Sequence, residues 1–102
     1  MTTAETITTL TFEQIINRYA EKVAVVADET PATDLDEFIG QLEIASENLD
    51  DTGIDSDDVD AAATLLAEAR TSDGSEQQVL LNRAGQRLLN ASGFLDDYEL
   101  ML

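Results

Sequence analysis

The chain has 102 residues, of which 22 are acidic and 5 are basic, and its formal net charge at pH 7 is −17. It contains neither Cys nor His, which excludes disulfides, thiolate and imidazole catalysis, and the usual zinc sites. Hydrophobic residues make up 43% of the sequence, which is more than a disordered acidic tail would carry, so we predict a chain that folds.

The N-terminal segment gives little sign of regular structure. Residues 2–9 are rich in β-branched side chains, but a lone strand without a partner is not stable. We therefore expect residues 1–10 to be a frayed, flexible segment and residues 11–102 to form a single helical domain. The N-terminus lacks the features of a signal peptide, and the longest apolar stretch, Val23–Ala27, is far below the ~20 residues that span a bilayer. We expect a cytoplasmic protein without membrane contact.

The first predicted helix begins after Thr11, which stands three residues before Gln14 in the spacing of a capping box. Leu10 precedes the cap and would pack against Ile15 as a hydrophobic staple. Over the following four turns the apolar side chains recur at helical spacing, with polar side chains on the opposite face. Pro31 predicts that this helix has ended before it.

The second predicted helix begins at Asp34, with Glu37 three positions further on. Gly53 is the predicted stop signal. The side chains that would be buried along this helix are Leu35, Phe38, Ile39, Leu42, Ala45 and Leu49.

The third predicted helix is capped by Asp55, with Ile54 and Val59 as its hydrophobic staple. The pair Asp73-Gly74 breaks the chain after it. The apolar face of this helix would consist of Val59, Ala62, Ala63, Leu66 and Ala69.

The fourth predicted helix opens with a second capping-box pair, Ser75 and Gln78, and Gly93 is its predicted stop signal. Its buried face would include Val79, Leu80, Ala84, Leu88 and Ala91. Each of the four apolar stripes is too small to be stable unless it packs on the others. The sequence therefore predicts an all-α fold, a compact bundle of about four helices.

The C-terminal segment, residues 94–102, is short and apolar. If it is helical, one face would carry Phe94, Leu95, Tyr98, Met101 and Leu102. One interpretation is that these side chains dock onto the bundle of their own chain, because a small domain needs every apolar group it has. The other is that they form a surface for self-association or for binding in a groove of a partner.

Acidic residues follow one side of the second helix. At 100° per residue, Asp36, Glu43, Glu47 and Asp50 lie in a narrow sector beside the apolar stripe, in a row ~21 Å long. The row continues into a second acidic group along the chain. We call the combined set the acidic face: Asp36, Glu43, Glu47, Asp50, Asp51, Asp55, Asp57, Asp58 and Asp60.

Such a surface could engage a basic protein, including a nucleic-acid-binding protein whose Lys and Arg side chains it would occupy in place of phosphates. A charge run is also typical of a merely solvated helix face, and acids at a helix N-terminus stabilise its dipole. A third interpretation is adaptation to concentrated salt, where a Debye length of ~3 Å makes self-repulsion tolerable. Arg83 and Arg87, one turn apart, would pair with acids of the bundle.

No cofactor, metal or catalytic site is predicted. A calcium loop with Gly53 at its sixth position would have Val59, and not a bidentate Glu, at its twelfth, so we expect only weak, nonspecific divalent binding. There is no Gly-rich phosphate loop, and no carboxylate pair lies in an apolar setting that would separate two pKa values. The negative charge and scarcity of aromatic residues disfavour direct nucleic-acid binding.

The sequence thus predicts a non-enzymatic protein-interaction module, an adaptor or inhibitor of the DNA-mimic or immunity type, that binds a basic protein through the acidic face. The alternative is a structural or assembly protein that forms a homo-oligomer through residues 94–102, with its acidity serving solubility.

Overall fold

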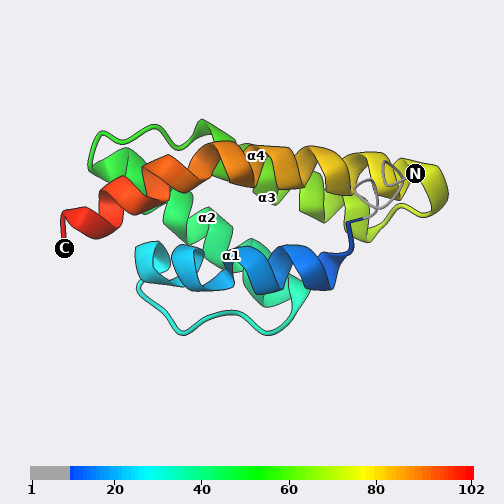
Figure 1. Ribbon diagram of the computed structural model, residues 1–102, viewed down its shortest axis with the longest axis horizontal. Coiled ribbons are helices and arrows are strands. Elements are labelled where there is room, and N and C mark those ends of the chain that lie inside the picture. Colours follow the sequence, from blue (N-terminus) through cyan, green and yellow to red (C-terminus); the bar gives the residue numbers. More distant parts are fainter. Residues whose placement is uncertain (1–9) are drawn as a thin grey trace, which may run out of the picture.

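The computed structural model describes residues 10–102, and the predictions made for residues 1–9 lie outside the described residues. Over the described range the chain is built of helices without strands, which confirms the predicted all-α bundle (Figure 1). The elements are α1 (Phe12–Ala27), α2 (Leu35–Asp51), α3 (Asp57–Arg70) and α4 (Gly74–Leu100).

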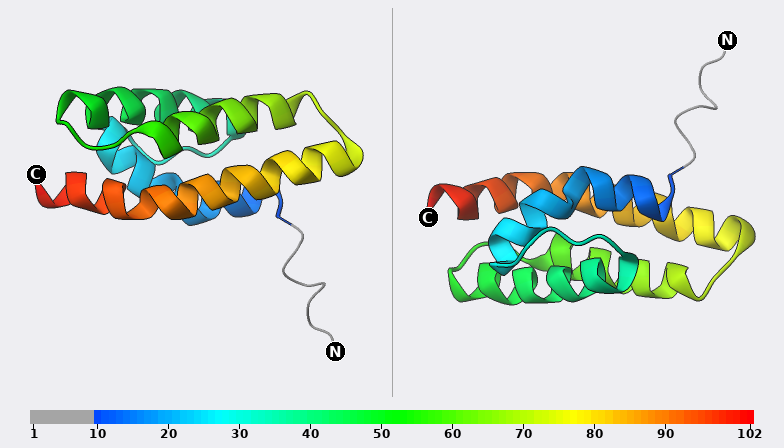
Figure 2. Two further views of the ribbon diagram at one scale, coloured as in Figure 1. Left: turned by 90° about the horizontal axis from the view of Figure 1, so that it is seen from above. Right: turned by 90° about the horizontal axis from the view of Figure 1, so that it is seen from below.

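The four helices pack in a closed ring. Each helix contacts the next one along the chain, and α4 returns to contact α1. Figure 2 shows α2 and α3 side by side as one layer, with α1 and α4 forming the other. The described part measures 43 × 30 × 22 Å, and its long axis follows α4 (Figure 1). Within residues 10–102, no helix has both the length and the hydropathy needed to cross a membrane.

The N-terminus of α1 is a complete capping box, as predicted. The Gln14 N–H donates to Thr11 Oγ1 and the Thr11 N–H donates to Gln14 Oε1, both at 3.1 Å. The helix ends at Ala27, where Asp28 adopts a left-handed conformation with φ of 59°. Pro31 therefore lies beyond a helix that has already stopped.

Both predicted ends of α2 are confirmed. Asp34 Oδ1 accepts a hydrogen bond from the Glu37 N–H at 2.8 Å. At the other end Gly53, with φ of 82°, donates its N–H to Asp50 O, and the Ile54 N–H reaches Leu49 O at 2.9 Å. This bonding pattern is a Schellman motif, which requires the left-handed residue that glycine supplies.

The predicted starts of the last two helices are wrong in detail. The N-cap of α3 is Ser56, while the Asp55 side chain forms a local turn by accepting from the Asp57 N–H at 2.9 Å. α4 begins at Gly74, so Ser75 lies inside the helix and no capping box forms there. Gln78 Nε2 instead donates to Leu10 O at 3.2 Å, far away in the sequence.

The predicted end of α4 is also wrong. The helix continues through Gly93 to Leu100, so the C-terminal segment extends α4. The buried stripe is shifted as well, because Val79 is 48% exposed and Leu81 is buried. Side chains recur at heptad spacing along this stripe, which is the pattern that keeps one side of a long helix in contact with neighbouring helices. They are Leu81, Ala84, Leu88, Ala91 and Leu95.

The core lies along the axis of the ring and draws on every helix. Its largest fully buried side chains are aromatic or branched aliphatic groups, among them Phe38, Leu42, Leu66 and Leu88. Gln41 is the one buried polar side chain in the described range, and its Nε2 donates to Thr30 O at 2.6 Å. This bond ties α2 to the loop that leads into it.

Candidate functional site

The row of acids on α2 faces solvent. Asp36, Glu43, Glu47 and Asp50 are all exposed, because the same helix turns Phe38, Ile39, Leu42, Ala45 and Leu49 inward. Four carboxylates over about 21 Å of helix correspond to one charge per about 7 Å. The row is therefore an extended feature and not a point of concentrated charge.

The acids that follow α2 continue this surface along the turn into α3. Asp51, Asp55, Asp57 and Asp60 are exposed, whereas the side chain of Asp58 is only 19% exposed. Asp57, Asp58 and Asp60 all lie in the first turn of α3, where negative charge stabilises the helix dipole. Part of the acidic face thus has a local structural role.

Few cations offset the acidic face. Arg87 in α4 pairs with Asp58 at 3.0 Å, which confirms the prediction for this arginine, and Arg70 at the end of α3 pairs with Asp36. Arg83 has no acidic partner within residues 10–102. Seven of the nine carboxylates of the acidic face therefore have no basic partner in the described part of the chain.

The carboxylates do not converge on a common point. Across residues 10–102, no group of three or more acidic side chains is arranged to hold a metal ion. On α2 the acids stand one or two turns apart on one helix, and this spacing separates their oxygen atoms. The arrangement is better suited to several separate cationic groups of a partner than to one ion.

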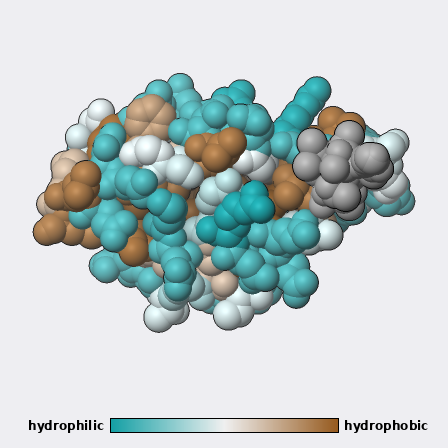
Figure 3. Space-filling model, viewed as in Figure 1, coloured by the Kyte–Doolittle hydropathy of each residue, from teal (hydrophilic) through white to brown (hydrophobic). Residues whose placement is uncertain are grey.

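The C-terminal side chains divide into two groups. Leu95 is 1% exposed and Tyr98 packs against the core, so this part of the segment docks onto its own bundle. Phe94 is half-buried. Met101 and Leu102 are 61% and 78% exposed. In Figure 3 brown, hydrophobic residues gather at the end of the molecule where the chain terminates.

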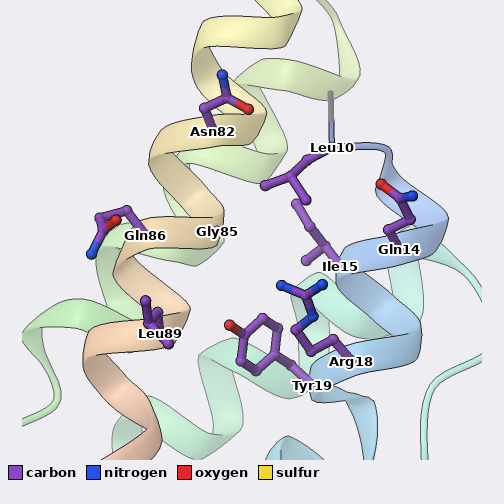
Figure 4. Close-up of a pocket in the computed structure, with 9 residues that line it drawn as sticks. All are labelled: Leu10, Gln14, Ile15, Arg18, Tyr19, Asn82, Gly85, Gln86 and Leu89. Carbon is purple, nitrogen blue, oxygen red and sulfur yellow. The ribbon is translucent and has the colours of Figure 1, made fainter. Parts of the chain in front are cut away.

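A cleft of about 280 Å³ between α1 and α4 was not predicted from the sequence. Figure 4 shows polar side chains from both helices around it, with Gly85 between them on α4. The only sequence signals are the neighbours Arg18 and Tyr19 on one helix and a pair of amides one turn apart on another. The polar lining residues are Gln14, Arg18, Tyr19, Asn82 and Gln86.

Comparisons with protein-family models, with curated proteins and with solved structures found no match.

Proposed function

We propose that this chain is a non-enzymatic interaction module that binds a basic protein through the acidic face. The observation that carries the proposal is the solvent exposure of carboxylates that have no basic partner within residues 10–102. Opposite charge on a partner would steer association and relieve the repulsion among these groups. An adaptor or an inhibitor could both use such a surface.

The spacing of the carboxylates on α2 indicates what kind of basic partner would fit the acidic face. One carboxylate per about 7 Å along α2 is sparser than the phosphates of a nucleic-acid strand, which follow every 3.4 Å or so. The acids between α2 and α3 raise the local density at one end of the row. The partner that fits is a protein with basic side chains spread over an extended surface, and a nucleic-acid-binding groove is one example.

The test compares two variants that change the net charge equally. Glu43→Gln, Glu47→Gln and Asp50→Asn remove three charges from the acidic face. Glu13→Gln, Glu68→Gln and Asp97→Asn remove three from exposed acids elsewhere. Partners captured from the producing cells at low salt and released at high salt are identified, and their affinity for both variants is measured with purified protein.

We expect the first variant to bind such a partner at least about threefold more weakly than the wild type, because three surface ion pairs are lost. The second variant should bind as the wild type does. Equal weakening by both variants would show that net charge alone governs binding. An unchanged affinity in the first variant would exclude the acidic face as the binding surface.

A second candidate function, assembly of copies of this chain, is favoured by the exposed end of α4. Leu100 is 85% exposed, and Leu102 lines a shallow groove with Val25, which is itself partly exposed. Burial of these side chains between two copies would remove apolar surface from water. Deleting residues 100–102 should then abolish oligomers seen by sedimentation equilibrium, and a monomeric wild type at all salt concentrations would exclude this function.

A further inference from the structure

We propose that the cleft between α1 and α4 binds a small organic monocarboxylate, through Arg18 and Tyr19 of α1 and through apolar side chains that line both sides of the cleft. This inference does not depend on the acidic face. The cleft volume of about 280 Å³ equals roughly nine water molecules. It lies just below the usual range for small-molecule sites, so the ligand must be compact.

The first observation is the charge of the cleft. The guanidinium of Arg18 points into the space between the two helices (Figure 4). Lys22, Arg70 and Arg87 each pair with an acid, but no carboxylate in residues 10–102 lies within ion-pair distance of Arg18. A guanidinium presents a planar fork of donors that matches a carboxylate. The cleft therefore holds a cation that is free to bind an anion from outside the described chain.

The second observation is a buried phenol. Tyr19 is only 5% exposed, and its hydroxyl points into the cleft (Figure 4). Within residues 10–102 no hydrogen bond engages this hydroxyl, so it can donate to a ligand oxygen that enters the cleft. Arg18 and Tyr19 together thus provide two donors for one carboxylate.

The apolar side chains that line the cleft determine the chemistry of the part of the ligand beyond its carboxylate. Leu10 and Ile15 line one side of the cleft and Leu89, which is 60% exposed, lines the other. Gly85 places no side chain between them. A group of about six carbons attached to the carboxylate would cover these side chains. The net charge of −17 repels polyanions more strongly than a single negative charge, so the cleft selects monocarboxylates over phosphate or citrate.

The test uses hexanoate and benzoate as probes, titrated into the full-length protein at about 0.15 M salt, where the Debye length is about 8 Å. Backbone and side-chain amide shifts are followed by NMR. We expect saturable shifts confined to the cleft, including the side-chain amides of Gln14 and Gln86. Hexan-1-ol, which lacks the carboxylate, should bind at least about tenfold more weakly.

Variants assign the binding to the cleft. Arg18→Gln should weaken hexanoate binding about tenfold or more, and Tyr19→Phe, which keeps the ring, should weaken it severalfold. Arg83→Gln is the matched control, because it removes the same charge from an arginine outside the cleft. The proposal would be overturned if Arg18→Gln bound hexanoate as tightly as the wild type, or if Arg83→Gln lost as much affinity as Arg18→Gln. Amide shifts scattered over the surface would overturn it as well. Neutralising Glu43, Glu47 and Asp50 should leave hexanoate binding intact, so this proposal and the acidic-face proposal fail independently.

Discussion

Gly85 is the glycine whose missing side chain has the clearest structural consequence. A Cβ atom at this position would lie 2.7 Å from Leu10 Cδ1, which is closer than real contacts allow. Gly93 lies in the same helix, and Gly40 lies in α2, but a Cβ atom at either would meet nothing within 4 Å. Gly85 therefore lets Leu10 reach α4 at the wall of the cleft, whereas the other two glycines only lower helix stability.

These three glycines give a matched stability test. We expect Gly40→Ala and Gly93→Ala each to raise the free energy of unfolding by about 0.5–1 kcal/mol, because alanine favours the helix. Gly85→Ala should gain less, since Leu10 must move aside. Urea unfolding followed by circular dichroism compares the three variants. If Gly85→Ala stabilises as much as Gly93→Ala, Leu10 does not occupy this space in solution.

The helix α4 contributes to the packed bundle beyond Gly93. The part of α4 after this glycine buries Leu95 completely and packs Tyr98 on the core. A lone glycine costs a helix about 1 kcal/mol, and burial of one Leu side chain contributes about 1.5–3 kcal/mol. Packing therefore outweighs the local preference to stop.

Leu95 and Leu102 allow the stability contribution of a buried side chain in the C-terminal segment to be compared with that of an exposed one. We expect Leu95→Ala to lower the free energy of unfolding by about 2–5 kcal/mol, because it leaves a cavity in the core. Leu102→Ala should change it by less than about 0.5 kcal/mol, since that side chain is 78% exposed. Thermal or urea unfolding measures both. A large loss in Leu102→Ala at a concentration where the protein is monomeric would contradict the exposed placement.

The helix ends show what the sequence could and could not predict. The caps at Thr11 and Asp34 and the stop at Gly53 depend on hydrogen bonds between residues a few positions apart, so local spacing is sufficient evidence. The Ser75–Gln78 pair has the same spacing and fails, because α4 already begins at Gly74 and the Gln78 side chain bonds to Leu10, 68 positions away. Local patterns cannot reveal such a competing partner.

Some features of the candidate sites could likewise be predicted from the sequence, and others could not. Exposure of Glu43, Glu47 and Asp50 follows from the phase of the apolar stripe on one helix, so it was predictable. The Arg70–Asp36 pair and the cleft at Arg18 depend on which helices become neighbours. That pairing is decided by packing of the whole bundle, which no single helix encodes.

Negative charge is the dominant property of the molecule. Three ion pairs join described residues, and each involves at least one side chain that is 40% or more exposed. Pairs of this kind contribute between about 0 and 1 kcal/mol, so they offset little of a net charge of −17. Folding brings the remaining carboxylates closer together, and their repulsion must lower the stability of the compact state.

Salt should therefore stabilise the fold. As sodium chloride rises from about 0.01 M to about 1 M, the Debye length falls from about 30 Å to about 3 Å, and we expect the free energy of unfolding to increase. The neutralised variant Glu43→Gln, Glu47→Gln, Asp50→Asn should be more stable than the wild type at low salt by about 0.6–1.5 kcal/mol, because it removes three like-charged pairs on α2: Glu43–Glu47, Glu47–Asp50 and Glu47–Asp51.

This gain should vanish near 1 M salt, where the repulsion is already screened. The variant Glu13→Gln, Glu68→Gln, Asp97→Asn has the same net charge but removes no such neighbouring pair, so its gain at low salt should be smaller. Urea titrations of the three proteins across the salt series measure both differences. A wild-type stability that is independent of salt would mean that the acidic face is not under strain in the free protein, and a basic partner would then gain nothing from relieving it.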